Sequence, residues 1–180
     1  RTTVNPFYVQ EIAEALKGVD IPVFVKNPIH PELGLWLGAF ERLNKVGIKQ
    51  LAAIHRGFYS YEKSVFRNDP KWELPIKLRK EIRGLPIICD PSHIAGKATL
   101  IEDIAQTAMD INLDGLMIET HNNPAVALSD AEQQVKPEKL KNIMQNLVLR
   151  DTKLRDEQFK EQLLDFRNQI DNFDTQIIGL

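Results

Sequence analysis

The stretch LPIICDPSHIAGK, residues 85–97, decides how the chain is interpreted. It begins as a short apolar run and ends abruptly at Asp90, which is followed by the turn-forming Pro91 and then by His93. An apolar run without alternation is typical of a parallel strand that is covered on both faces. A buried strand that stops at an acid and an imidazole predicts that this end of the strand belongs to a functional site.

Three other apolar runs of this kind occur, and segments with helical periodicity separate them. The predicted strands span residues 21–26, 48–55, 85–90 and 115–120, and the predicted helices span residues 6–18, 31–47, 100–113 and 137–149. Asn5 is a candidate N-cap for the first helix, with Pro6 at the first helical position. Strict alternation of strands and helices predicts a parallel sheet built from βα units.

Two architectures fit this alternation, a doubly wound sheet and a (β/α)8 barrel. A complete barrel needs eight strands in about 250 residues, whereas this chain has 180 residues and four predicted strands. We therefore predict an α/β fold that is part of a barrel over residues 1–150, followed by a helical segment over residues 151–180. The chain opens with arginine and stops inside a helical pattern, so we expect it to be a piece of a longer polypeptide.

The composition excludes several classes of protein. Hydrophobic residues make up 43% and charged residues 27% of the chain, as in soluble globular proteins. A net charge of -2 gives no general attraction to nucleic acid or to anionic membranes. No apolar run approaches the roughly 20 residues that span a bilayer. The single cysteine, Cys89, lies in an apolar run, so we expect a reducing, cytoplasmic compartment without structural disulfides.

Each predicted strand ends at a charged or ligand-forming residue. One such residue is common, because strands often end where they reach solvent, but four in succession favour a shared site at the carboxyl edge of the sheet. Lys26 and Arg56 follow the first two strands, and Arg1 opens the chain. Arginine suits phosphate through its planar fork, and lysine suits carboxylate or phosphate as a point charge.

A second set of strand-end residues, His93, Glu119 and Asp130, offers one nitrogen and two oxygen donors. This mixture suits a borderline divalent metal such as Mn, Fe, Co or Zn. His93 alone would be interpreted as a structural histidine in a turn, and the two carboxylates favour the metal site instead. Cations beside a metal predict a polyanionic substrate. The metal would polarise a carbonyl or hold a water molecule.

These strand ends resemble, in order, the motifs in the second half of the barrel of 3-deoxy-7-phosphoheptulonate synthases, the family that opens the shikimate pathway of aromatic amino acid biosynthesis. The matching segments are RTT (1–3), VKN (25–27), HRGF (55–58), DPSHIAGK (90–97), IETHNNP (118–124) and ALSDAEQQ (127–134). The segment YEKSVFRN (61–68) points to the subgroup related to 3-deoxy-octulosonate 8-phosphate synthase. The resemblance implies the C-terminal half of a TIM barrel.

The resemblance also implies an activity, the metal-dependent condensation of phosphoenolpyruvate with erythrose 4-phosphate. It implies that Lys26, Arg56 and Asp90 are catalytic residues. Asp90 would either contact a metal ligand without binding the metal itself or lie beside the substrate. The implied substrate-binding residues are Arg1, Thr2, Lys26 and Arg56, and the implied metal ligands are His93, Glu119 and Asp130. The family's fourth ligand, a cysteine, and its Lys-Pro-Arg-Thr motif belong to the first half of the barrel, and Cys89 lies too deep in its strand to replace the cysteine.

The tail changes character from Asp151 onward. Leu163, Phe166, Ile170 and Phe173 recur at three- and four-residue intervals, which predicts an amphipathic helix. A coiled-coil or bundle helix is one interpretation. The segment also resembles the start of helical (type II) chorismate mutases, which are known fused to such synthases. This resemblance implies that Arg167 is a catalytic residue and that chorismate and prephenate are ligands.

Two alternatives to the synthase remain open from the sequence. One is 3-deoxy-octulosonate 8-phosphate synthase, a related enzyme whose acceptor is a five-carbon sugar phosphate. The other is a regulatory or oligomerisation module without catalysis, in which the site has decayed. The complete set of strand-end residues favours the synthase, for which we expect a homo-oligomer.

Overall fold

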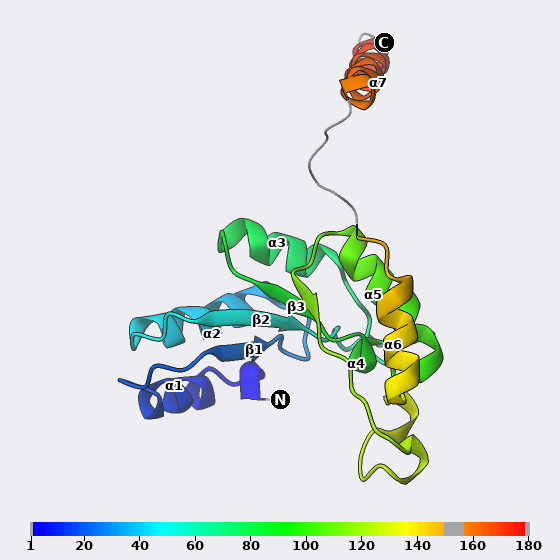
Figure 1. The fold of residues 1–180 in the computed structure, drawn as a ribbon. Coiled ribbons are helices and arrows are strands. Elements are labelled where there is room, and N and C mark those ends of the chain that lie inside the picture. The colour runs from blue at the N-terminus through cyan, green and yellow to red at the C-terminus, as the bar shows by residue number, and fades with distance from the viewer. Residues whose placement is uncertain (1, 150–156, 179–180) are drawn as a thin grey trace. The chain divides into compact units, whose positions relative to one another are not determined.

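The structure of the chain is a computed structural model that describes residues 2–149 and 157–178. The chain divides into two compact units, residues 1–148 and residues 149–180 (Figure 1). Arg1, one of the predicted substrate-binding residues, lies outside the described residues.

The first unit is built on a four-stranded sheet in which all neighbouring strands are parallel. Its strands are β1 (Val23–Lys26), β2 (Leu51–His55), β3 (Ile87–Cys89) and β4 (Gly115–Leu116). They lie in the order β1-β2-β3-β4, so that neighbours along the chain are neighbours in the sheet. A doubly wound sheet reverses its strand order at a switch point, and this sheet does not. The predicted α/β fold is confirmed, and the order is that of a partial barrel.

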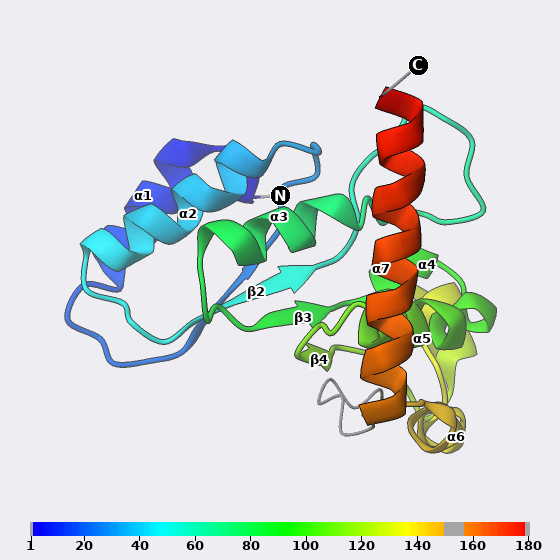
Figure 2. The ribbon, with the colours of Figure 1, turned by 90° about the horizontal axis from the view of Figure 1, so that it is seen from above.

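Helices separate the strands and continue to the end of the unit. They are α1 (Pro6–Ala15), α2 (Leu33–Lys45), α3 (Glu73–Glu81), α4 (Pro91–Ala95), α5 (Ile101–Asp110) and α6 (Pro137–Asn146), with short 3-10 helices η1 (Thr2–Val4), η2 (Ala98–Leu100), η3 (Pro124–Val126) and η4 (Ala131–Gln133). Figure 2 shows α1 and α2 side by side, and Figure 1 shows α5 and α6 beside each other at the other end of the sheet. The side chain of Asn5 accepts a hydrogen bond from Phe7 N at 3.0 Å, as predicted for the N-cap of α1.

Two elements beside the strand ends differ from the sequence predictions. Pro91 does not open a simple turn but occupies the first position of α4, because Asp90 caps that helix. The last strand is shorter than the predicted 115–120, because β3 ends at Cys89 and its last backbone bond to this strand is from Met117 N–H. Beyond it, Glu119 and His121 bond to the backbone of Val135 and not to β3. The amide of Glu119 instead bonds to the Ser92 hydroxyl at 3.0 Å.

A single apolar core packs the helices against the sheet and fixes where the strands end. Trp36 of α2 is fully buried and donates from Nε1 to the carbonyl of Val25 in β1 at 3.2 Å. Ile87 of β3 and Ile101 of α5 are also fully buried. Truncating a buried residue of this size costs about 3–5 kcal/mol, so the strand ends rest on a stiff base.

The second unit contains α7 (Glu157–Ile178). Its apolar residues Leu164, Phe166, Ile170 and Phe173 are each more than half exposed. Within the described residues, no helix is both long and apolar enough to cross a bilayer.

Candidate active site

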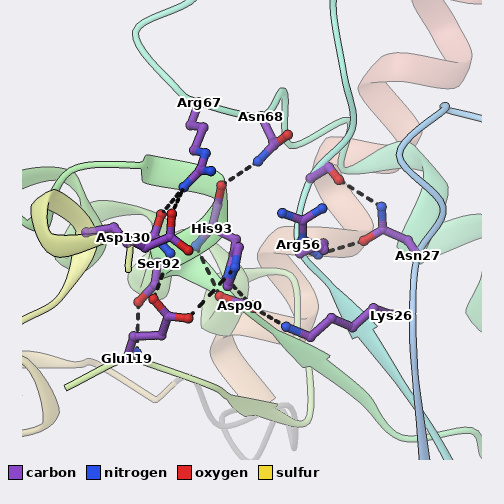
Figure 3. Close-up of polar contacts among 12 residues, drawn as sticks. Lys26, Asn27, Arg56, Arg67, Asn68, Asp90, Ser92, His93, Glu119 and Asp130 are labelled. Atoms are coloured by element: carbon purple, nitrogen blue, oxygen red, sulfur yellow. Dashed lines mark hydrogen bonds and ion pairs between the residues drawn. The ribbon is translucent and has the colours of Figure 1, made fainter. Parts of the chain in front are cut away.

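The carboxyl ends of the four strands bring the predicted site residues to one edge of the sheet. Lys26 is the last residue of β1, and Arg56 follows β2 directly. Asp90 follows β3, and Glu119 lies three residues beyond β4. Figure 3 shows Lys26 and Arg56 on one side of Asp90 and His93, with Glu119 and Asp130 on the other.

The local sequence around Asp90 explains how a buried strand delivers a histidine to this edge. Asp90 Oδ1 accepts a hydrogen bond from the backbone N–H of His93 at 3.1 Å and so caps α4. Pro91, at the first helical position, has no N–H that needs a partner. Gly96 ends the helix in the left-handed conformation, with φ of 68°. The single turn between the cap and this stop holds His93 at the strand end.

The carboxylate of Asp90 also joins the cations to the ligand residues. Its Oδ2 atom lies 2.8 Å from His93 Nδ1 and 3.3 Å from Lys26 Nζ, and the residue is only 1% exposed. Burial by itself would raise the pKa of Asp90, but hydrogen bonds and charge from His93, together with the charge of Lys26, hold it below the ordinary value. Asp90 is therefore an anion at neutral pH.

This anion orients the imidazole of His93. The Nδ1 atom lies 2.8 Å from Asp90 Oδ2, although the alignment falls short of full hydrogen-bond geometry. A carboxylate at Nδ1 favours the tautomer in which Nε2 carries the lone pair. The Nε2 atom lies 3.8 Å from Glu119 Oε1, so the free nitrogen points toward the carboxylates.

His93, Glu119 and Asp130 form a candidate metal site. Each offers one ligand atom, and these atoms all lie within 4.8 Å of one another. One imidazole nitrogen and two carboxylate oxygens at this spacing fit a divalent ion of the Mn, Fe, Co or Zn type. Asp130 adopts a left-handed backbone conformation, with φ of 50°, which costs about 1–3 kcal/mol outside glycine and is found preferentially at functional sites.

The two carboxylates have further partners that sequence analysis did not assign. Gln133 donates from Nε2 to Glu119 Oε2 at 2.7 Å, and Arg67 donates from Nη1 to Asp130 Oδ1 at 2.7 Å. The Arg67 hydrogen bond is the main reason that the pKa of Asp130 lies below its ordinary value, and the charges of Arg67, His93 and Arg56 act in the same direction. Both residues lie inside the quoted motifs, at 61–68 and 127–134, but neither follows a strand directly, so strand-end placement gave no signal for them.

The cation side of the edge is organised by Asn27, which is 3% exposed. Its Oδ1 accepts from the backbone N–H of Arg56 at 2.7 Å, and its Nδ2 donates to the carbonyl of Gly57 at 2.8 Å. These bonds tie the end of β1 to the end of β2. They fix the backbone from which Lys26 and Arg56 project.

The N-terminal segment reaches the same strand end. Thr3 donates from Oγ1 to the carbonyl of Lys26 at 2.9 Å. Thr2, predicted to bind substrate, is the first residue of η1, so its backbone lies next to this contact.

Two other residues that could carry chemistry, His55 and Cys89, are not arranged for it. His55 is fully buried beside Trp36, Phe58 and Trp72, and neither ring nitrogen has a hydrogen-bond partner of full geometry among the described residues. Burial lowers the pKa of His55 to about 3, outweighing the opposing effects of the Pro70 backbone and of Asp90. Burial likewise raises the pKa of the Cys89 thiol, so it remains neutral within β3.

Residues 6–155 match the family model of the DAHP synthetase I family, where DAHP is 3-deoxy-D-arabino-heptulosonate 7-phosphate. The chain belongs to this family. The family resemblance predicted from the strand-end motifs is therefore confirmed.

Individual relatives agree with the family. A phospho-2-dehydro-3-deoxyheptonate aldolase of Thermotoga maritima is 29% identical over 126 residues, which are 70% of this chain and 37% of that protein. A 2-dehydro-3-deoxyphosphooctonate aldolase of Legionella pneumophila is 25% identical over 160 residues, covering 79% of this chain and 54% of that protein.

Solved structures show the same fold. A truncated 3-deoxy-D-arabino-heptulosonate 7-phosphate synthase of Thermotoga maritima superposes with a TM-score of 0.70 and 26% identity, over 81% of this chain and 53% of that one. A phospho-2-dehydro-3-deoxyheptonate aldolase from the same organism gives 0.71 and 27%, over 81% and 41%. The chain thus spans about half or less of the length of these relatives.

Proposed function

We propose that this chain supplies the metal-ligand and phosphate-binding half of a 3-deoxy-7-phosphoheptulonate synthase, which condenses phosphoenolpyruvate with erythrose 4-phosphate and releases phosphate. The observation that carries the proposal is the meeting of His93, Glu119 and Asp130 within 4.8 Å, beside the Lys26–Asp90 pair. Family membership supports the same chemistry.

In this mechanism the cations bind the substrate. Arg56 and Lys26 bind the phosphate and carboxylate of phosphoenolpyruvate, for which a guanidinium fork and an ammonium are well suited. Asn27 holds the backbone of Arg56, so the substrate meets a cation whose base is already in position. Such preorganisation spares the entropy of ordering these side chains during the reaction.

The anionic side chains hold the metal site and orient its histidine. A divalent ion held by His93, Glu119 and Asp130 would supply Lewis acidity for a carbonyl oxygen or a bound water. Asp90 keeps the His93 ring turned so that Nε2 faces the other two ligands, at 3.8 Å from Glu119 Oε1. Because Asp90 also lies 3.3 Å from Lys26 Nζ, it sets the separation between the substrate-binding cations and the ligand cluster.

The experiment is a condensation assay on the full-length protein, following phosphate release from phosphoenolpyruvate in the presence of erythrose 4-phosphate. We expect His93→Ala to reduce the rate at saturating substrate to background, because the metal is lost. Arg56→Ala should keep its metal and raise the KM for phosphoenolpyruvate by about 10- to 100-fold, the loss of one charge-assisted contact of about 1.5–3 kcal/mol. A wild-type protein that released no phosphate from this substrate pair would refute the proposal.

The acceptor sugar separates this function from its nearest alternative. The Legionella relative, named for a deoxyphosphooctonate, is 25% identical, so a five-carbon sugar phosphate is the second candidate acceptor. Assaying arabinose 5-phosphate beside erythrose 4-phosphate decides between the two. We expect kcat/KM to be higher for erythrose 4-phosphate.

For the tail we propose a chorismate mutase function, in which Arg167 binds a carboxylate of chorismate. The support is a 22-residue helix, α7, that carries Arg167 one residue after Phe166 and keeps several apolar side chains exposed. A mutase needs no nucleophile or metal, only cationic and hydrogen-bonding complementarity to the rearranging dicarboxylate. Loss of chorismate in the presence of the full-length protein tests this proposal independently of the synthase.

A further inference from the structure

Two adjacent residues, Arg67 and Asn68, lie against the candidate metal site although they belong to the long connection between β2 and α3. Their backbone N–H groups donate to the carbonyls of Ala95 and Ile94, each at 3.2 Å. These bonds attach the connection to α4, the helix that carries His93. The position of the pair is therefore set by the backbone and does not depend on side-chain contacts alone.

From this position the pair reaches all three ligand residues (Figure 3). Asn68 donates from Nδ2 to the carbonyl of His93 at 2.6 Å. Arg67 Nη1 donates to Asp130 Oδ1 and to Gln133 Oε1, both at 2.7 Å. Gln133 connects Arg67 to the third ligand residue, because its Nε2 donates to Glu119 Oε2 at 2.7 Å.

Two glycines make this approach possible. A Cβ atom on Gly96 would lie 2.5 Å from the Cβ of Arg67, and one on Gly57 would lie 2.8 Å from the Cβ of Asn68. Both glycines have positive φ, 68° and 75°, where other residues are strained. The backbone is thus shaped so that this pair lies directly against the ligand-bearing elements.

The hydrogen bonds have a consequence for coordination, because each carboxylate has one oxygen engaged. Glu119 keeps Oε1, which faces His93 Nε2 at 3.8 Å, and Asp130 keeps Oδ2. Calcium takes six to eight oxygen ligands and commonly binds carboxylates through both oxygens. Smaller borderline metals are satisfied by one nitrogen or oxygen atom from each residue.

We propose that Arg67 and Gln133 are positioning residues for the divalent-metal site, which hold Asp130 and Glu119 to one donor oxygen each and so favour a borderline metal over calcium. This inference rests on the metal site of the proposed function. The positive charge of Arg67 opposes a bound cation, but its side chain is 48% exposed and water screens the repulsion. Carboxylate orientation by outer partners is worth 10- to 100-fold in metal affinity, so positioning is the larger effect.

The test measures binding of Mn²⁺ alone to the metal-stripped full-length protein, from the electron paramagnetic resonance signal of free Mn²⁺, and then its displacement by Ca²⁺. The variants are Arg67→Met, Arg67→Lys and Gln133→Met. Arg79→Met is the matched control, because Arg79 pairs with Asp114 at 2.8 Å with similar exposure but away from the site. We expect the three site variants to bind Mn²⁺ about 10- to 100-fold more weakly and to favour Ca²⁺ relative to wild type, with the control unchanged in both.

Arg67→Lys separates position from charge, since it keeps the charge but its Nζ ends one bond short of the position of Nη1, the atom that donates to both acceptors. Unchanged or tighter Mn²⁺ binding in Arg67→Met would overturn the inference and leave Arg67 as a repelling charge. So would a loss of the same size in Arg79→Met, which would indicate a general effect on stability. A wild-type protein that bound no Mn²⁺ would refute the metal site itself, whereas normal wild-type binding with unaffected variants would refute only the roles of Arg67 and Gln133.

Discussion

The strand-end site and helix α7 both carry polar residues that the sequence assigns to catalysis, but they differ in what holds those residues. At the strand ends, His93 is fixed by Asp90, and Asp130 by Arg67. On α7, Arg167 is exposed and lies among exposed apolar side chains. Chemistry can be inferred where the same chain fixes both the residue and its partners. A helical pattern alone leaves that inference to experiment.

The largest effect is expected from a substitution on α7. Arg167→Lys keeps the charge but loses the two-pronged contact with a carboxylate, so we expect mutase activity to fall by at least about 100-fold, with helicity and oligomer size unchanged. The measurement is loss of chorismate by the full-length protein. Equal activity in the variant, or none in the wild type, would return α7 to a purely structural helix.

A smaller effect is expected from a partner residue at the strand ends. Asp90→Asn removes the anion at 2.8 Å from His93 Nδ1 while keeping nearly the same shape. We expect metal affinity to fall by about 10-fold and the KM for phosphoenolpyruvate to change as well, because Lys26 loses its ion pair. Metal titration and steady-state kinetics check the two parts. If neither quantity changed, Asp90 would be only a helix cap.

The last effect concerns stability rather than activity, and it separates the site from the core beneath it. His55 has a folded-state pKa of about 3 against 6.5 in the unfolded chain, so the unfolded state binds the proton first as pH falls. Its contribution to stability is complete above pH 6.5 and is lost toward pH 3, at about 1.4 kcal/mol per pH unit. We expect His55→Leu to flatten the fall of the melting temperature between these values.

The control for this prediction is His121→Leu, since His121 is only partly buried and its Nδ1 already accepts a hydrogen bond from Asn123. It should leave the pH dependence as in wild type. If His55→Leu showed the same acid sensitivity as wild type, another group would have to be responsible.

The sequence predicted much of the fold because parallel strands buried on both faces have a distinctive pattern. It located the four strands, and the number of strands, rather than their alternation with helices, favoured part of a barrel over a doubly wound sheet. The helix over Glu73–Glu81 was implied by that alternation but not located, since its mean hydropathy is low and Arg79 and Lys80 give it a polar surface. The final strand is short because the residues after it pair with Ser92 and with the backbone of Val135, contacts that no local pattern reveals.

The site residues also fall into two groups, those that the sequence could predict and those that it could not. Residues that directly follow a strand could be predicted, because topology brings the carboxyl ends of parallel strands to one edge. Arg67 could not, because it reaches the site through a loop whose course depends on close packing at Gly57 and Gly96. Gln133 could not, because it lies in η4, well beyond the end of β4. Tertiary packing of this kind leaves no periodic signal in the sequence.

The amount of metal bound per chain tests whether His93, Glu119 and Asp130 form one metal site. It should be measured by elemental analysis in the purified full-length protein and in His93→Ala, Glu119→Ala and Asp130→Ala, with folding monitored by circular dichroism. We expect about one divalent ion in the wild type and strongly reduced occupancy in every variant, with folding retained. Full occupancy in all three variants would contradict this expectation.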